Sequence, residues 1–357
     1  MKFVKWALAA AMTMSLGLPT AHADAPFKAA WIYVGPVSDH GYSFQHDQGR
    51  KAVEAALGAK VKTTFVESVP EGADAERVLT QLARDGNKLI FSTSFGFMNA
   101  TLKVARAFPD VKFEHATGYK RAANVSTFSA RFYEGRAVLG TIAGKMTKTG
   151  VVGYIASIPI PEVVRGIDAF TIALRKVRPD AKVKVIYVNS WYDPGKEAAA
   201  AKALIDQGAD VLAQHTDSAA PVQTAEERGV WCFGQSSDMT RYAPHRLLTG
   251  IIENWDQYDV AEVKAAMNGS WKSHDTWGGL ASGMVKLSPY NPAMPRDVVA
   301  AAEKTRQDII AGKLNPFAGP ITDQSGKLVV PAGKSLSDAQ LLGLRFYVQG
   351  VEGNLPK

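Results

Sequence analysis

The stretch AKVKTTFVES spans residues 59–68, and AKVKVIYVNS spans residues 181–190, 122 positions further along the chain. The same shift, without a gap, aligns two more pairs of segments: 82–95 with 204–217, and 29–34 with 151–156. Any two segments that alternate strands with helices share hydrophobic periods, but they do not share one register over three segments. The repeat therefore predicts two homologous lobes.

Short β-rich runs alternate with helical segments through most of the chain. The runs that we interpret as buried strands are 29–35, 61–67, 88–93, 151–156, 183–188, 210–214 and 229–234. Between them, segments such as DAERVLTQLARDG and EVVRGIDAFTIALRKV carry apolar residues at helical spacing. Strands that alternate with helices form parallel sheets covered by helices on both faces. The predicted fold class is α/β, with two Rossmann-like lobes joined by a hinge.

The repeat also predicts where the chain passes between lobes and where a ligand would bind. We assign residues 24–125 to lobe one, with a return segment at about 250–288, and residues 126–249 to lobe two, with a C-terminal segment at about 289–357. Parallel sheets bind ligands at the carboxyl ends of their strands, which predicts a cleft between the lobes. The loops expected to line it are 35–44, 67–72, 93–99, 157–165, 189–195 and 215–219.

The N-terminus has the pattern of a secretory signal peptide over residues 1–23. Lys2 and Lys5 precede an apolar stretch at 6–18, and Ala21-His22-Ala23 supplies a small-x-small cleavage site. Thirteen helical residues cover about 20 Å, short of the roughly 30 Å hydrocarbon layer, which disfavours a membrane anchor. No cysteine follows the apolar stretch to carry a lipid. We therefore expect cleavage before Asp24 and an unlipidated protein in the periplasm.

Composition excludes several classes of function. The 357-residue chain has a formal charge of +7, but its basic residues are spread along the sequence and no nucleic-acid-binding motif accompanies them. The single cysteine, Cys232, lies in the apolar segment GVWCFG and is predicted to be a buried small side chain rather than a nucleophile. We expect a monomer that does not bind nucleic acid.

Two of the predicted loops carry aromatic residues just ahead of a helix. Tyr42 lies in GPVSDHGYSFQHDQGR (35–50), and Trp191 lies in NSWYDPGKE (189–197). A flat ligand could lie between the two rings, and stacking of a base on an aromatic ring is worth roughly 1–3 kcal/mol. Alternatively, each ring covers the core of its own lobe. The local sequence leaves both interpretations open.

Polar groups in other loops could recognise the edge of such a ligand. Asp217 in HTDSAA and Asp238 in GQSSDMTR could each accept hydrogen bonds from ring or exocyclic N–H groups. The alternative for both acids is capping of the helical segment that follows. Three further candidates for the pocket wall are Phe95, Thr216 and Trp255.

Catalytic signatures are missing from the sequence. There is no G-x-S-x-G, H-E-x-x-H, Walker loop or G-x-G-x-x-G. His40 and His46 are six residues apart, which does not place them on one helical face, and no third metal ligand accompanies them. We therefore expect no catalytic residues, no cofactor and no metal, and the protein is predicted not to be an enzyme.

Four motifs, in order along residues 29 to about 290, together resemble the Bmp family of purine nucleoside receptors of ABC importers. They are SDHGYSFQHDQGR, TSFGFMNATLKVARAFPDVKF, YEGRAVLGTIAGKMTKTGVVGYIA and NSWYDPGKEAAAAKALIDQGADV. The resemblance implies a type I periplasmic binding protein fold and a purine ligand. It also implies that Tyr42 and Trp191 occupy the two stacking positions of the family and that Asp238 matches an acid of the family's G-x-D-[ST]-D-Q segment.

Two departures from the family pattern bear on the ligand. Where the family has a glycine-rich A-G-G-T-G turn, this chain has QHTDSAA, and Glu253 in TGIIEN stands where the family commonly has a lysine near the ribose. Side chains in place of glycines fill space, and a carboxylate accepts hydrogen bonds where an ammonium donates them. We expect these changes to favour a purine nucleobase, adenine-like, over a nucleoside.

The resulting hypothesis is a periplasmic substrate-binding protein that closes on a purine and delivers it to an inner-membrane ABC permease. Tyr42 and Trp191 would sandwich the ring, while Asp217 and Asp238 would read its edge. One alternative is a receptor for another small polar solute, such as a sugar that stacks on the same rings. The other is a periplasmic nucleoside hydrolase, which would require an acid cluster around a metal or a water.

Overall fold

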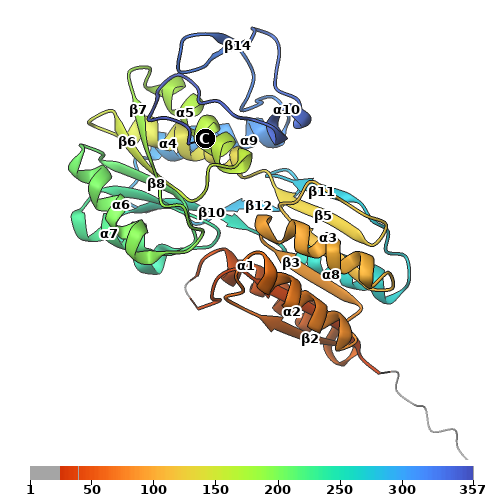
Figure 1. Cartoon of the computed structure of the whole chain (residues 1–357). Coiled ribbons are helices and arrows are strands. Elements are labelled where there is room, and N and C mark those ends of the chain that lie inside the picture. The colour runs from red at the N-terminus through yellow and green to blue at the C-terminus, as the bar shows by residue number, and fades with distance from the viewer. Residues whose placement is uncertain (1–24, 39, 357) are drawn as a thin grey trace, which may run out of the picture.

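The computed structural model describes residues 25–38 and 40–356, which form two α/β lobes (Figure 1). The predicted signal peptide lies outside the described residues. Lobe one has a six-stranded parallel sheet in the order β11-β5-β4-β3-β1-β2. Its strands are β1 (Phe27–Tyr33), β2 (Val61–Val66), β3 (Leu89–Thr93), β4 (Lys112–Ala116), β5 (Val125–Ala130) and β11 (Asp275–Gly278). Its helices are α1 (Tyr42–Leu57), α2 (Ala73–Arg84), α3 (Met98–Ala107) and α8 (Asp256–Met267).

Lobe two has a seven-stranded sheet in the order β12-β10-β9-β8-β6-β7-β15, in which only β12 pairs antiparallel with its neighbour. Its strands are β6 (Val151–Ala156), β7 (Lys182–Tyr187), β8 (Val211–His215), β9 (Trp231–Gly234), β10 (Leu247–Glu253), β12 (Val285–Leu287) and β15 (Val351–Glu352). Its helices are α4 (Phe132–Met146), α5 (Pro161–Val177), α6 (Pro194–Asp206), α7 (Ala220–Arg228) and α9 (Arg296–Ile310).

The internal repeat reappears in the topology of the two sheets. A shift of 122 residues carries the paired segments of β1, β2 and β3 onto β6, β7 and β8. Both sheets then share one strand order, 2-1-3-4-5 in lobe one and 7-6-8-9-10 in lobe two. The two-lobed α/β architecture predicted from the sequence is therefore confirmed.

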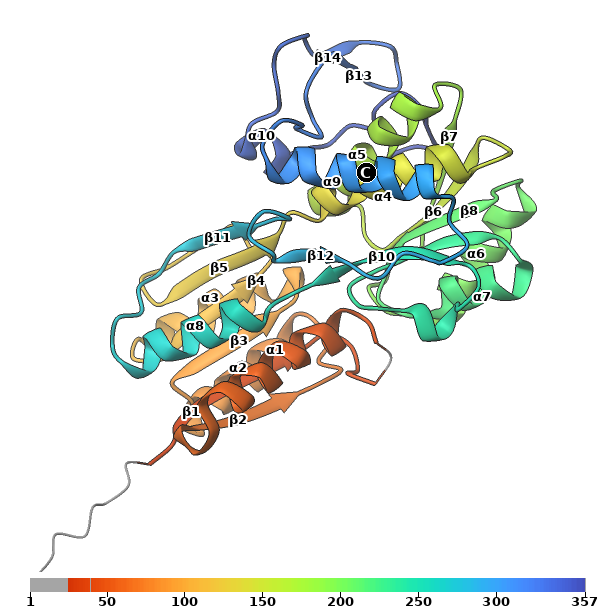
Figure 2. The ribbon, with the colours of Figure 1, turned by 180° about the vertical axis from the view of Figure 1, so that it is seen from behind.

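The C-terminal segment packs on lobe two. Helix α9 runs beside α4, and the hairpin of β13 (Ile321–Thr322) and β14 (Leu328–Val330) and the short helix α10 (Asp338–Leu342) lie beyond α5 (Figure 2). In the described part of the chain, no helix combines the length and the apolarity needed to span a bilayer.

The chain crosses between the lobes three times, and these crossings form the hinge. They lie between β5 and α4, between β10 and α8, and between β11 and β12. Arg131 joins two of them, because its backbone N–H donates to the Gly278 carbonyl at 2.6 Å and its Nε donates to the Trp277 carbonyl at 3.0 Å. The crossings differ by a few residues from the expected boundaries, since β5 extends lobe one to 130 and both β10 and β12 belong to the sheet of lobe two.

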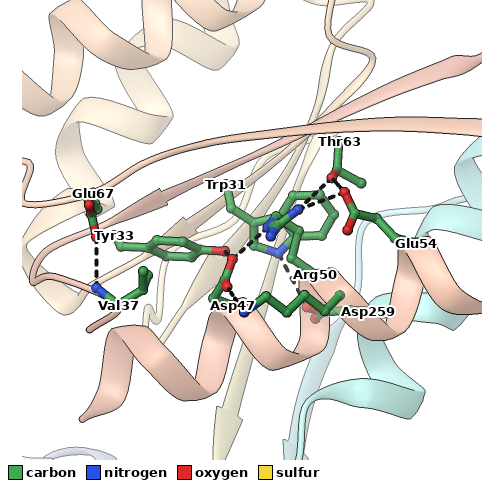
Figure 3. A network of polar contacts seen from close by, with 10 residues as sticks. Trp31, Tyr33, Val37, Asp47, Arg50, Glu54, Thr63, Glu67 and Asp259 are labelled. Carbon is green, nitrogen blue, oxygen red and sulfur yellow. Dashed lines mark hydrogen bonds and ion pairs between the residues drawn. The ribbon is translucent and has the colours of Figure 1, made fainter. Parts of the chain in front are cut away.

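A polar network fixes α1, the helix that begins at Tyr42, against the sheet of lobe one (Figure 3). Asp47 accepts hydrogen bonds from the Tyr33 hydroxyl at 3.3 Å and from Arg50 Nε at 2.6 Å, and Lys51 Nζ lies 2.8 Å from its other oxygen. Burial alone would raise the pKa of Asp47, but the hydrogen bonds from Arg50 and Lys51 lower it. The network holds the start of α1 in a fixed position relative to β1.

Candidate ligand-binding site

One pocket is lined by residues from both lobes and encloses about 340 Å³ of empty space, its opening included. Lobe one contributes Val34, Tyr42, Ser94, Phe95 and Thr117, and lobe two contributes Phe132, Glu162, Trp191, His215, Asp217, Gln235 and Glu253. Most of these residues lie at or just beyond the carboxyl ends of parallel strands, which is where open α/β sheets bind ligands.

The two predicted stacking residues both line this pocket, one from each lobe. Tyr42 is the first residue of α1, and Trp191 lies in the loop between β7 and α6. Burial raises the pKa of Tyr42 well above 10, and the nearby carboxyl of Glu253 raises it further, so the phenol is neutral. The Trp191 carbonyl accepts from the Asp217 backbone N–H at 2.9 Å, which ties together two loops of lobe two that line the pocket.

Three further candidates are placed in or beside the pocket. Phe95 lines it and is half-buried, and Asp217 lines it and is buried. Thr216 is fully buried next to Asp217, where its hydroxyl lowers the pKa of the Glu197 carboxyl, although burial keeps that pKa above its ordinary value. Thr216 is not a lining residue.

The structure does not bring Trp255 and Asp238 to the pocket lining. Trp255 is fully buried and stacks on His46 with ring centroids 4.7 Å apart, so it belongs to the core of lobe one. Asp238 is exposed, and its Oδ1 accepts from the backbone N–H and the hydroxyl of Thr240 at 3.0 and 2.5 Å. The alternative interpretation of Asp238, as an acid that caps the turn after it, describes this geometry.

Glu162 and His215 of lobe two both line the pocket, and Arg136, which the sequence did not single out, lies buried near them. Glu162 lies in the first turn of α5, and His215 Nε2 is 3.7 Å from its carboxylate. Arg136 on α4 is fully buried and donates from Nη2 to the Gln235 side-chain oxygen. Glu162 lies within the loop at 157–165 that the sequence predicted to line the cleft. Arg136 lies within α4, and nothing in the neighbouring sequence distinguishes this buried arginine from one on the surface.

Burial shifts the pKa values of Glu162 and His215 in the directions that favour their neutral forms. It raises the pKa of Glu162 to about 7, despite the opposing charge of Arg165. It also lowers the pKa of His215 well below 6.5, and Arg136 and Arg165 lower it further. His215 is therefore a neutral imidazole at neutral pH.

Contacts across the pocket bring the lobes close together. A Cβ at Gly41 of lobe one would lie 1.9 Å from the Asp217 carbonyl oxygen of lobe two, so only glycine permits this approach. The Ser237 hydroxyl donates to the His40 carbonyl, and Arg241 Nη1 lies 3.0 Å from His40 Nε2. Because the Arg241 guanidinium can only donate, His40 Nε2 is the unprotonated acceptor.

Comparison with known proteins places these observations in a family. The Bmp family model, described as "ABC transporter substrate-binding protein PnrA-like", matches residues 27–315. A purine-binding protein of Brucella abortus is 55% identical over 337 residues, covering 94% of this chain and 96% of that protein. A putative ABC transporter glucose-binding protein of Haloferax volcanii is 36% identical over 329 residues, covering 92% of this chain and 81% of that protein.

Solved structures share the fold at low sequence identity. A solute-binding protein of an ABC transporter system from Aeropyrum pernix K1 superimposes with a TM-score of 0.71 at 20% identity, covering 83% of this chain and 94% of that one. A transcriptional activator of the comK gene from Bacillus halodurans gives a TM-score of 0.68 at 22% identity, covering 81% and 99%. The type I periplasmic binding protein fold that the motifs implied is thereby confirmed. The family model spans most of the sequence, and the chain therefore belongs to the Bmp family of PnrA-like ABC transporter substrate-binding proteins.

Proposed function

We propose that this protein captures a purine in the pocket between its lobes. The observation that carries the proposal is the placement of Tyr42 from lobe one and Trp191 from lobe two on the same small pocket. Stacking between two rings holds a flat heterocycle on both faces and tolerates any base, because every base has a π-face. The purine-binding relative from Brucella abortus, similar over nearly its whole length, supports the same ligand class.

Within that class, the pocket favours a nucleobase of the adenine type over a nucleoside. The HTDSA turn that replaces the family's glycine-rich turn lies against Gly41, with the Asp217 carbonyl in the space that a side chain there would need. Glu253, which replaces the family's lysine, is fully buried in the pocket wall. Asp217 lines the same pocket and would accept a hydrogen bond from a base N–H. From both replacements we infer that a ribose would have less room here than the family pattern allows.

The proposed cellular role follows from the family. The mature protein would begin at Asp24, move freely in the periplasm as a monomer, and hand its ligand to an inner-membrane ABC permease after hinge opening. Osmotic shock should release it, and N-terminal sequencing of the released protein should begin near Asp24. Recovery in the membrane fraction with Met1 intact would contradict this placement.

A ligand-identification experiment tests the proposal most directly. Protein purified without added ligand is denatured, and the released small molecules are identified by mass spectrometry. In parallel, ligand-stripped protein is screened by thermal shift against adenine, hypoxanthine, adenosine and inosine. A ligand at 100 times its Kd adds about 2.7 kcal/mol to stability, so a purine should raise the melting temperature clearly. A screen in which no purine stabilises the protein would refute the proposal.

A sugar is the second candidate ligand, favoured by the similarity to the putative glucose-binding protein of Haloferax volcanii. Aromatic rings such as Trp191 can also stack on a sugar, and the buried acids could accept from its hydroxyls. The same thermal-shift screen therefore includes glucose and ribose. Hydrolysis of nucleosides is tested separately by incubation with inosine, where release of free hypoxanthine would indicate an enzyme.

A further inference from the structure

Glu253 is the last residue of β10, and its side chain lines the pocket while being fully buried. Its backbone N–H donates to the Ser236 carbonyl at 3.0 Å, which fixes the direction of the side chain. Neither carboxyl oxygen has a hydrogen-bond partner of normal geometry among the described residues, although the side chains of Ser236 and Trp255 lie near. Burying an ionised carboxylate in such surroundings is strongly unfavourable.

The charged and titratable groups around Glu253 do not compensate for an ionised carboxylate. Glu162 approaches from α5 and Tyr42 from α1, and a negative charge on Glu253 would disfavour ionisation of both. Arg136 on α4 is the cation that lowers the pKa of Glu253, but this effect is weaker than the opposite effect of Glu162. Its Nη2 donates to Gln235, whereas its Nε and Nη1 have no hydrogen-bond partner among the described residues. The surroundings therefore favour the uncharged form.

The direction in which the pKa of Glu253 is shifted supports the same conclusion. Burial raises the pKa of Glu253 well above 4.5, and it outweighs the nearby Ser236 hydroxyl, which lowers this pKa. The neighbouring carboxyl of Glu162 raises it further. An acid with a raised pKa is protonated below that pKa and loses its proton as the pH rises through it. A protonated carboxyl differs from a carboxylate in chemistry, since it has one O–H donor beside a carbonyl acceptor.

We propose that Glu253 determines ligand specificity as a protonated carboxylic acid, which donates its O–H to a ring nitrogen or carbonyl oxygen and accepts from an adjacent N–H of one uncharged heterocycle. This inference rests on the proposed capture of a purine and deepens it. Adenine offers a ring nitrogen beside an N–H, and hypoxanthine offers a carbonyl oxygen beside an N–H. A carboxylate could pair only with the N–H, and it would leave the ligand's acceptor buried and unsatisfied.

Calorimetry with adenine across a pH series tests the assignment in the full-length mature protein. For the wild type, affinity should fall by up to about tenfold per pH unit once the pH exceeds the pKa of Glu253, because only the protonated form pairs fully. Glu253→Gln keeps a donor and an acceptor but cannot lose a proton, so this alkaline fall should disappear. Glu253→Ala should weaken binding roughly ten- to a hundredfold at neutral pH. Glu227→Gln, an exposed glutamate on α7, is the matched control.

A second measurement separates this inference from the proposed function, because it needs no ligand. Infrared difference spectra between the wild type and Glu253→Gln should show the C=O stretch of a protonated carboxylic acid at neutral pH, in ligand-free protein. Glu162→Gln is recorded alongside, so that a band from the other buried acid is recognised.

The outcomes are distinct. The acid band together with loss of the alkaline fall in Glu253→Gln supports the inference. Adenine binding with no such band, or with the same alkaline fall in Glu253→Gln as in the wild type, overturns the inference and leaves purine capture intact. A wild type that shows the band but binds neither adenine nor hypoxanthine refutes purine capture, and with it the role assigned to Glu253.

Discussion

The indole N–H of Trp191, on lobe two, donates to Glu71 Oε1, on lobe one, across 3.2 Å. The same oxygen accepts from the Ser94 hydroxyl at 2.5 Å and from the Gly96 backbone N–H at 3.1 Å. Glu71 is therefore held by its own lobe and fixes the Trp191 ring only when the lobes are together. The residue proposed to stack on the ligand is thus also a point of contact between the lobes.

Substitutions at Trp191 should separate stacking from this interlobe hydrogen bond. Trp191→Ala should weaken purine binding by roughly 1–3 kcal/mol, about ten- to a hundredfold, because one face of the ring is lost. Trp191→Phe keeps an aromatic face but removes the indole N–H, so its loss should be smaller and should match more closely that of Glu71→Ala, which removes the acceptor. Calorimetry with the purine found in the screen gives these values. Unchanged affinity in both Trp191→Ala and Tyr42→Ala would rule out the sandwich.

The close approach at Gly41 predicts a defect in closure rather than in folding. In Gly41→Ala, the added Cβ would overlap the Asp217 carbonyl oxygen, only 1.9 Å away, and this contact joins two lobes rather than the core of either. Overpacking of this kind costs about 1–3 kcal/mol, so purine affinity should fall about ten- to a hundredfold. The melting temperature of the ligand-free protein should stay close to that of the wild type.

Gly343→Ala is the control for Gly41→Ala, because a Cβ at Gly343, just after α10, would meet only the Ala339 carbonyl oxygen at an ordinary 3.8 Å. It should change neither affinity nor melting temperature. If Gly41→Ala binds purine as tightly as Gly343→Ala, the lobes do not approach this closely in the bound protein.

We expect purine affinity to fall in acid because His40 becomes protonated. Burial lowers the pKa of His40 below 6.5, and Arg241 lowers it further, partly offset by Asp238. The imidazole is thus neutral at pH 7 and accepts from Arg241, while protonation as the pH falls through the lowered pKa places two cations side by side across the lobes. Exposed charge contacts are worth about 0.2–1 kcal/mol, so purine affinity should fall about two- to fivefold below pH 6.5.

The matched variant for this prediction is His40→Asn. His40 has a left-handed φ of 58°, which asparagine tolerates, and its backbone carbonyl remains available to Ser237. The difference in pH dependence between the wild type and His40→Asn isolates the imidazole from the acids of the pocket. Parallel pH profiles for the two proteins would show that His40 does not regulate closure.

The predicted preference for a nucleobase depends on the two places where this chain departs from the family pattern, QHTDSAA and Glu253. Calorimetry on ligand-stripped protein should show adenine or hypoxanthine binding at least about tenfold tighter than the matching nucleoside, a difference of about 1.4 kcal/mol. We expect this preference because side chains stand at positions where the family pattern has glycines, and a glutamate stands where it commonly has a lysine. Equal affinity for adenosine and adenine would leave purine capture in place and refute this preference.

Much of the site's location could be predicted from local pattern. The repeat located the strand ends, and the loops at 35–44 and 189–195 indeed bring Tyr42 and Trp191 to one pocket. The same reasoning failed to distinguish Asp217 from Asp238, since both follow a strand and precede a helical segment. One is buried in the pocket lining and the other is exposed and accepts from Thr240. The backbone conformation of each loop sets the direction in which its aspartate side chain points, and hydrophobic periodicity carries no information about loop conformation.

The sequence by itself determined the two α/β lobes and indicated the family, because hydrophobic periods, a repeat at a shift of 122 residues and ordered motifs can all be read along the chain. Only the tertiary structure decided that Glu253, Glu162 and Arg136 are buried near one another, and that Trp255 stacks on His46 inside lobe one. These residues meet through the pairing of distant strands and the approach of two lobes. Their burial, and hence their protonation, depends on how completely those contacts exclude water.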